Sequence, residues 1–279
     1  MIPYPNIDPD IVRIGPIAVR WYGMMYLIGF VSSYLLVKYQ IKKQGLGPKG
    51  KGPGARVKGQ GSGVKGQEYS VAFLDSLYTY SVLGLMIGAR LGYVVFYNLS
   101  FYIRHPLDVF AVWQGGLSFH GGLIGSVLAG IWCCRKFQKD PWQVSDLVMA
   151  TAPIGIGLGR LGNFINGELY GRVSDVSWAM VFPNGGPLPR HPSQLYEFLL
   201  EGVVLFSLLW ILKDKGFKAG VLTSIFILLY GIFRFIVEFF REPDQQLGFI
   251  AGPFTMGQFL SLSMVIIGAG IFYLRKKQS

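Results

Sequence analysis

Charged residues and cysteines are scarce in this chain. Only 15% of its 279 residues are Asp, Glu, Lys or Arg, whereas soluble domains carry about 25%. The two cysteines, Cys133 and Cys134, are adjacent, and neighbouring cysteines rarely pair with each other. Two ligands are also too few for a zinc site. The sequence therefore argues against a soluble fold and a disulfide framework, and we expect no metal and no other cofactor.

Apolar residues are abundant instead and make up 51% of the chain. A helix needs about 20 mostly apolar residues to cross a bilayer. We therefore predict an all-α membrane protein in which residues 1–279 form a single integral membrane domain with seven transmembrane helices. Glycines four residues apart in the second and third helices predict close helix packing there. The seven apolar stretches are roughly 17–37, 71–97, 115–134, 146–165, 196–212, 219–240 and 253–274.

Basic residues are distributed unevenly among the segments that join these stretches. Seventeen of the 26 Lys and Arg residues follow the first, third, fifth and seventh stretches, and five lie in the other connecting segments. Because basic residues are enriched on the cytoplasmic side of a membrane, we expect the N-terminus outside and the C-terminus in the cytoplasm. Topology thereby accounts for the net charge of +11, and nucleic-acid binding is not expected.

Two of the connecting segments are unusual in composition or length. Residues 45–67 are rich in glycine and lysine, which is typical of a flexible chain, so we expect a basic cytoplasmic loop there. Electrostatic contact of this loop with anionic lipid is an alternative. Residues 166–195, between the fourth and fifth helices, form the longest external segment. We expect them to form a small external cap.

Ionisable residues inside a membrane-spanning helix are costly and are therefore functional candidates. With the orientation above, Arg90, Arg160 and Arg234 lie at one depth, in the outer half of the membrane. The guanidinium fork binds phosphate oxygens in pairs, so we predict a cationic pocket for the headgroup of an anionic phospholipid. The alternative is ion pairing, because Arg234 and Glu238 are four residues apart on one helix.

His120 lies near the outer end of the third stretch, after Ser118 and before two glycines. An imidazole there can act as a general base or as a structural hydrogen-bond partner, and the sequence leaves both open. No GxSxG motif accompanies Ser118, which disfavours a serine protease. The GxGxxG pattern at 157–162 lies inside an apolar stretch and follows no strand, so it does not predict a dinucleotide site.

The stretch GRLGNFINGELYG at 159–171 is similar to the signature of the phosphatidylglycerol–prolipoprotein diacylglyceryl transferases, bacterial enzymes that begin lipoprotein maturation. The resemblance covers nearly the whole chain. It departs from the family at 45–67, where a shorter loop with less glycine is expected. Further blocks that carry the resemblance are RWYG at 20–23, HGGLIG at 120–125, RHPSQLYE at 190–197 and the residues from Tyr230 to Arg241.

This resemblance implies a reaction, partners and a location. A diacylglyceryl group moves from phosphatidylglycerol to the thiol of a lipobox cysteine in a preprolipoprotein, a thioether forms and glycerol phosphate leaves. The enzyme would lie among the bilayer lipids of the bacterial cytoplasmic (inner) membrane, with its active site toward the outer leaflet. An outer-leaflet phospholipid transporter or flippase is the alternative function, because intramembrane charges also mark transporters.

The resemblance also implies roles for individual residues. Arg160 and Arg234 would hold the lipid phosphate. The proton of the attacking thiol would go to His120 or to a carboxylate such as Glu168 or Glu238, and the sequence does not decide between them. For Glu168, capping of the loop is the alternative. The residues that would line or brace the site are Tyr22, Asn163, Glu168, Gly171, Tyr230 and Glu238.

Overall fold

The computed structural model describes residues 2–5, 7–15, 17–47, 68–243, 249–252 and 254–277. The chain divides into two compact units. The first comprises Met1–Gln40, Lys58–Lys65 and Ser145–Ser279, and the second comprises Ile41–Val57 and Gly66–Val144. Most of the predicted basic loop at 45–67 lies outside the described residues, which resume at Glu68.

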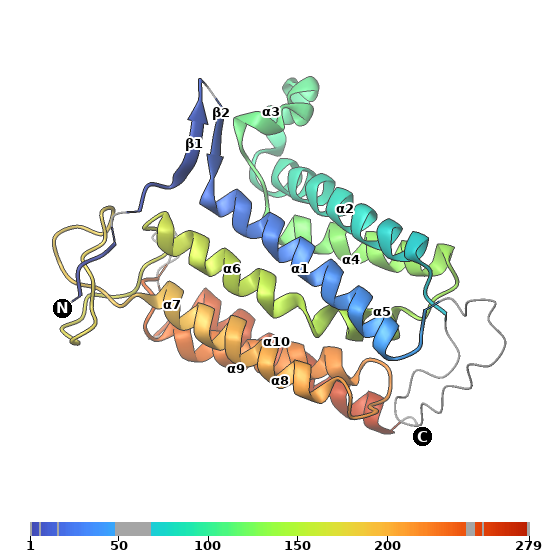
Figure 1. Cartoon of the computed structure of the whole chain (residues 1–279). Coiled ribbons are helices and arrows are strands. Elements are labelled where there is room, and N and C mark those ends of the chain that lie inside the picture. Colours follow the sequence, from blue (N-terminus) through green and yellow to red (C-terminus); the bar gives the residue numbers. More distant parts are fainter. Residues whose placement is uncertain are drawn as a thin grey trace. The chain divides into compact units, whose positions relative to one another are not determined.

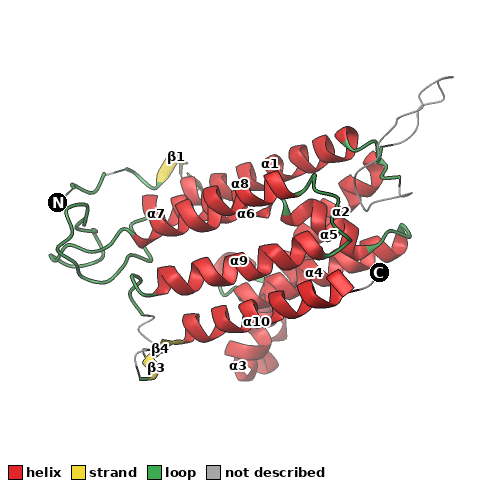
Figure 2. Ribbon diagram, turned by 90° about the horizontal axis from the view of Figure 1, so that it is seen from below, coloured by secondary structure: helices red, strands yellow, loops and turns green. Residues whose placement is uncertain are grey.

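The first unit contains two short hairpins and most of the helices. Helices α6 and α9 each pack against the continuous run of α7, η3 and α8 (Figure 1), and α10 packs along α9 (Figure 2). Both hairpins are antiparallel and pair β1 with β2 and β3 with β4. In chain order the elements are β1 (Asp10–Ile14), β2 (Ile17–Arg20), α1 (Trp21–Lys43), α5 (Pro141–Met149), α6 (Ala152–Ile165), α7 (Ser193–Glu197), the π-helix η3 (Phe198–Val204), α8 (Leu205–Leu212), α9 (Val221–Glu238), β3 (Phe249–Ala251), β4 (Phe254–Thr255) and α10 (Met256–Lys277).

Helix α6 approaches η3 closely in this unit. A Cβ atom added to Gly157 of α6 would lie 2.9 Å from the Cα atom of Gly202 in η3, so only glycine permits this spacing. One buried apolar cluster, formed by Ala150, Leu205, Leu209 and Leu222, joins α8 to α9 and to the residues just before α6. The close approach brings the polar residues of α6 and of the α7–η3 segment within reach of one another.

The second unit is built on two long helices. It consists of α2 (Val71–Tyr97), α3 (Leu99–Arg104), the 3-10 helices η1 (Pro106–Phe110) and η2 (Val112–Gln114), and α4 (Phe119–Lys136). Helices α2 and α4 cross through their glycines, because a Cβ atom on Gly84 would lie 2.5 Å from the carbonyl oxygen of Gly125. The close helix packing predicted from the glycine spacing is confirmed.

Among the described residues, five helical segments are long and apolar enough to span a membrane: α1, α2, Ser193–Leu212, α9 and α10. Helices α5 and α6 make a sixth if the pair, bent by 44°, is one span. The remaining predicted stretch, the third one at 115–134, forms α4, which is not among these candidate spans. The chain is therefore a mostly helical, multi-pass membrane protein.

The segment at 166–195 is packed against the end of α6. Its Met180 and Phe182 form a buried cluster with Phe164 of α6, and Tyr4 from the N-terminal segment packs against the same cluster. The Tyr4 hydroxyl lies 2.6 Å from the carbonyl oxygen of Phe164 and donates a hydrogen bond to it. An N-terminal residue therefore fixes the point where α6 leads into this segment.

Candidate active site

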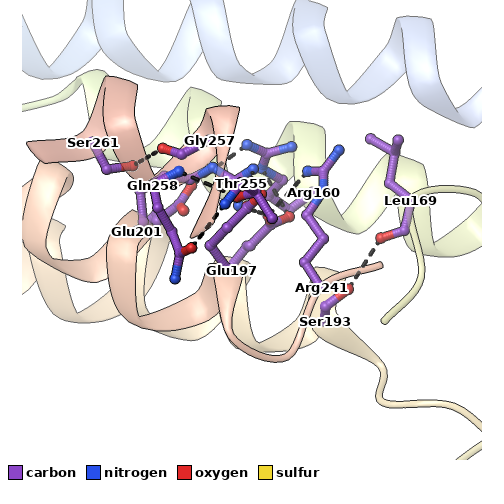
Figure 3. A network of polar contacts seen from close by, with 12 residues as sticks. Arg160, Leu169, Ser193, Glu197, Glu201, Arg241, Thr255, Gly257, Gln258 and Ser261 are labelled. Atoms are coloured by element: carbon purple, nitrogen blue, oxygen red, sulfur yellow. Dashed lines mark hydrogen bonds and ion pairs between the residues drawn. The ribbon is translucent and has the colours of Figure 1, made fainter. Parts of the chain in front are cut away.

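Arg160 of α6 forms the first ion pairs of a buried network. Its Nε atom lies 3.2 Å from Oε2 of Glu197, and its Nη2 atom lies 3.6 Å from Oε2 of Glu201 (Figure 3). Glu197 ends α7 and Glu201 lies in η3, so both carboxylates come from the segment packed against α6. Tyr230 from α9 lies close enough to Arg160 to interact with it electrostatically.

Arg234 extends the same network through α9. Its Nη1 atom lies 2.7 Å from Oε1 of Glu197, and its Nη2 atom lies 2.8 Å from Oε2 of Glu238. Thr255, just before α10, donates a hydrogen bond of 2.8 Å to the other oxygen of Glu238. Arg241 also contacts Glu197, with 3.4 Å between Nη1 and Oε1. The ion pair between Arg234 and Glu238 that the sequence offered as an alternative is therefore present.

The carboxylates lie deeper than the arginines. The exposed side-chain fractions are 0% for Glu197 and Glu201 and 6% for Glu238, compared with 19% for Arg160, 15% for Arg234 and 11% for Arg241. A guanidinium group has five N–H donors, and the ion pairs with the carboxylates use only some of the donors of Arg160 and Arg234. The three arginines and three glutamates are formally neutral together, so the site is not the purely cationic pocket that the sequence predicts.

Of the carboxylates in this network, Glu201 has the fewest hydrogen bonds. Among the described residues, neither of its buried oxygens accepts a hydrogen bond. It lies in η3, a π-helix of seven residues, and π-helical segments inside helices frequently occur at functional sites. Buried polar groups normally have hydrogen-bond partners, which makes Glu201 a functional candidate.

A second polar group lies at the end of α6. Asn163, one turn after Arg160, donates a hydrogen bond of 2.8 Å to Oε1 of Glu168, and Asn166 donates one of 3.1 Å to the same oxygen. Asn163 also bonds to the hydroxyl of Tyr22 in α1, which lies 3.0 Å from that of Tyr26. The bonds from nearby asparagines to Glu168 fit the loop-capping alternative.

Two buried residues of α7 support the turn that carries Glu168. Gln194 donates a hydrogen bond of 2.7 Å to the carbonyl oxygen of Glu168, and Ser193 donates one of 3.1 Å to that of Leu169 (Figure 3). Leu169 has a φ of 58°, which is unfavourable for a bulky residue and occurs mostly where surrounding structure enforces it. The α7 residues therefore hold Glu168 in place.

Gly171 lies in a gap that excludes any side chain. Its N–H donates a hydrogen bond of 2.8 Å to the carbonyl oxygen of His191, and a Cβ atom at this position would lie 2.7 Å from that same oxygen. Arg190 braces the region, because its Nη1 atom contacts both the carbonyl oxygen of Gly171 and a carboxylate oxygen of Glu242. Gly171 thus pairs with Arg241 just beyond the end of α9, and the guanidinium group of Arg190 contacts its carbonyl oxygen.

His120 and Arg90 belong to the second unit. His120 is exposed near the start of α4, and its ring lies against that of Phe119 with centroids 5.7 Å apart. Within the part of the chain that the structure describes, its imidazole forms no hydrogen bond, and its role stays a prediction. Arg90 is 4% exposed and binds backbone carbonyl oxygens of its own unit, which does not fit the predicted lipid contact.

Three members of the network have no role assigned to them from the sequence patterns: Glu197, Glu201 and Arg241. The available signal is a pair of glutamates four residues apart in an otherwise apolar stretch. Such a pair lies on one face of a helix, and two carboxylates on one face require a cationic partner. Among the described residues, no group of three or more His, Cys, Asp or Glu side chains is arranged to hold a metal ion.

The fold and the network define a class: a multi-pass helical membrane protein with a buried arginine–glutamate network. A family model described as Prolipoprotein diacylglyceryl transferase matches residues 9–274. The chain therefore belongs to the prolipoprotein diacylglyceryl transferase family.

Individual relatives agree with this assignment. A protein of Desulfotalea psychrophila named phosphatidylglycerol–prolipoprotein diacylglyceryl transferase is 48% identical, and the match covers 98% of this chain and 95% of that protein. Proteins of the same name from Geobacter sulfurreducens and Bordetella avium are 49% and 48% identical. Those matches cover 95% and 100% of this chain and 94% and 98% of the relatives.

Proposed function

We propose that this chain transfers the diacylglyceryl group of phosphatidylglycerol to a cysteine thiol of a prolipoprotein, the first step of lipoprotein maturation. Membership of the family supports the reaction, because similar full-length relatives carry this activity in their names. The structural observation that best supports the proposal is the arrangement of Arg160 and Arg234. Each has part of its guanidinium group held by buried carboxylates, while another part stays accessible.

The two arginines hold the phosphate of the donor lipid. The reaction breaks a carbon–oxygen bond between the diacylglyceryl group and the phosphate, so negative charge develops on the departing phosphate ester. Donors fixed in advance at that position stabilise the transition state more than donors that must reorganise. Glu197 and Glu201 position Arg160, and Glu197 and Glu238 position Arg234.

His120 takes the proton of the attacking thiol. The thiolate is the reactive form of cysteine; its sulfur forms the thioether bond to the diacylglyceryl carbon as glycerol phosphate leaves with the bonding electrons. The rival carboxylates are already engaged, Glu238 by Arg234 and Thr255 and Glu168 by Asn163 and Asn166. The imidazole of His120 is exposed and unpaired among the described residues, which favours it as the base.

The remaining site residues support these groups. Tyr22, Asn163 and Glu168 form a polar surface one turn from Arg160 along α6, suited to the glycerol hydroxyls or the acceptor peptide. Tyr230 orients Arg160, and Gly171 holds the cap against the end of α9.

The protein crosses the bacterial cytoplasmic membrane seven times. Helix α4, the third span along the chain, brings the six candidate spans to seven. Its N-terminus and the cap at 166–195 lie outside, the C-terminus and the loop at 45–67 lie in the cytoplasm, and the arginine–glutamate site faces the outer leaflet. The distribution of basic residues supports this orientation. The acceptor is then the lipobox segment of a preprolipoprotein exposed at the outer face among the bilayer lipids.

The test is chemical. The purified chain is incubated in phosphatidylglycerol vesicles with a peptide that carries one acceptor cysteine, and a peptide with serine in its place is the control. We expect a peptide enlarged by one diacylglyceryl group through a hydroxylamine-resistant thioether, and an equal amount of released glycerol phosphate. Lipid that moves between leaflets chemically unchanged, without release of glycerol phosphate, would instead support the transporter alternative.

A further inference from the structure

Every N–H donor of Arg90 has a backbone carbonyl partner. Nε donates to Val109 at 2.8 Å, Nη1 donates to Gly115 at 2.5 Å and to Gly116 at 3.1 Å, and Nη2 donates to Asp108 at 2.6 Å and to Ala111 at 3.1 Å. A guanidinium group has five N–H donors in total. The side chain is also buried, with the ring of Tyr102 5.3 Å from its carbon Cζ. Arg90 therefore has no donor left for a lipid phosphate.

The carbonyl oxygens that accept hydrogen bonds from Arg90 belong to the segment that leads directly into α4. Gly115 and Gly116 have φ values of 84° and 78°, a left-handed conformation that glycine adopts without strain. This turn directs both of their carbonyl oxygens toward Arg90. Two residues later, the N–H of Ser118 donates a hydrogen bond of 2.9 Å to the carbonyl oxygen of Ala89, the neighbour of Arg90.

Ser118 then begins α4 as its N-cap. Its hydroxyl oxygen accepts a hydrogen bond of 3.2 Å from the N–H of Gly121, which satisfies one free N–H of the first turn. On the adjoining face, a Cβ atom at Gly92 of α2 would lie 2.8 Å from the Cα atom of Gly121. The backbone on both sides of His120 is thus fixed to α2, while its imidazole is exposed.

We propose that Arg90 is a positioning residue for His120 and not a ligand of the lipid. It fixes the segment at 108–116, and that segment with Ser118 sets where α4 starts and hence where the His120 imidazole lies. The inference rests on the role proposed above for His120 as the base. Loss of the Arg90 fork then lowers kcat, whereas loss of a contact that only binds the lipid headgroup would raise KM for phosphatidylglycerol and leave kcat unchanged.

The test is a double-mutant cycle on the full chain in phosphatidylglycerol vesicles. The variants are Arg90→Lys, His120→Gln and the double variant. Arg104→Lys, which changes an exposed arginine on α3, is the matched control and should keep wild-type rates. General bases contribute about 10²–10⁴-fold to the rate, so we expect His120→Gln to lose at least about 100-fold. We expect Arg90→Lys to lose about 10-fold or more in kcat with little change in KM, and to cause no further loss in the His120→Gln background, because coupled residues are not additive.

Hydrogen exchange of residues 105–118 gives a readout that does not depend on activity. Arg90→Lys should speed exchange there and leave exchange in α9 and α10 unchanged. If Arg90→Lys does not fold, Ser118→Ala perturbs the same segment more gently and should also lower kcat only when His120 is present. Additive losses in the double variant, or a raised KM with unchanged kcat, would overturn the positioning role. Near-normal turnover of His120→Gln would instead refute the base assignment itself.

Discussion

Arg160 and Arg234 are held in position by ion pairs with carboxylates that are more buried than the arginines themselves. Removing one member of a buried ion pair is strongly destabilising, because the other charge is left uncompensated. Neutral pairing inside the network therefore lets three arginines occupy an apolar bundle without a ligand present. It also fixes the planes of the guanidinium groups, and in the proposed reaction such preorganised donors would stabilise the transition state.

Arg160→Lys tests this geometry. A lysine keeps the positive charge but has a single ammonium group that cannot contact Glu197, Glu201 and a phosphate with the planar fork of arginine. We expect kcat/KM for transfer to fall by about 10²–10³, the range seen when one fixed donor to developing charge is removed. Arg13→Lys, at an exposed position of β1, is the control. Wild-type activity in Arg160→Lys would show that charge alone is sufficient.

The sequence predicts that Arg160, Arg234 and Glu238 lie in the outer half of the membrane, which stays a prediction. The structure places all three in one network. The sequence does not identify Glu197 or Glu201 as partners, because which helix faces which depends on contacts that local patterns do not encode. For Arg90 the sequence patterns predict a lipid contact that the local structure does not favour. Residue type and depth make it equivalent to Arg160, but the conformation of a loop of 3-10 helices supplies its acceptors.

At the scale of elements, the cap is joined to the helices by backbone pairing. Arg172 donates a hydrogen bond of 2.9 Å from its N–H to the carbonyl oxygen of Phe240, and Gly171 bonds to His191 on the other side. The predicted cap is thus a folded segment, although no periodic pattern in residues 166–195 predicts these short pairings. The break between α5 and α6 and the π-helix η3 are likewise unpredicted, since both arise from packing between helices.

Gly171→Ala should displace this junction. The added methyl group would overlap the carbonyl oxygen and the Cβ atom of His191, and overpacking of this kind costs about 1–3 kcal/mol. We expect transfer to fall by at least about 10-fold and the cap to become sensitive to protease. Gly270→Ala on α10, where a Cβ atom would meet open space, should change neither property. An intact, protease-resistant cap in Gly171→Ala would contradict the steric explanation.

The cap should also loosen in acid because of His191. Burial lowers the pKa of His191, and its Nδ1 atom lies 3.0 Å from the hydroxyl of Tyr196, which accepts a hydrogen bond from Trp178. That hydroxyl is left to donate to Nδ1, which requires an unprotonated nitrogen. An unfolded histidine titrates near pH 6.5, so between the two pKa values the unfolded cap binds more protons than the folded cap.

The stability contributed by His191 is therefore present above about pH 6.5 and is lost as the pH falls toward the lowered pKa of the folded state. Limited proteolysis of the cap between about pH 5 and 7.5 measures this dependence. We expect faster cleavage at the acidic end for the wild type and a flatter profile for His191→Gln, which cannot titrate. The same pH dependence in both proteins would assign the effect to another group.

At the scale of the whole molecule, the sequence predicts most of the helices. Each of the seven predicted stretches contains a helix, and the second coincides with α2 at Val71–Tyr97. Such segments can be predicted from the length of an apolar stretch alone, without information about tertiary contacts. The hairpins at Asp10–Arg20 and Phe249–Thr255 are not predicted, because strands this short leave little periodic pattern.

The proposed orientation can be tested with single cysteines. Cys133 and Cys134 are buried and are first replaced by alanine. Leu188→Cys then places an exposed thiol in the cap, and Lys215→Cys places one between α8 and α9. We expect a membrane-impermeant maleimide to label position 188 but not position 215 in intact spheroplasts, and to label both after lysis. Labelling of position 215 before lysis would reverse the topology.

The bond between Tyr4 and Phe164 has a consequence for how the protein is made. The tyrosine is synthesised 160 positions before the carbonyl that it binds. At typical rates of translation its segment must wait on the order of ten seconds or more before α6 exists. During that interval the first residues need to remain unengaged and on the side of the membrane where the cap will form. A bulky fusion partner at the N-terminus would therefore interfere with the final step of assembly, whereas a tag placed after α10 would not.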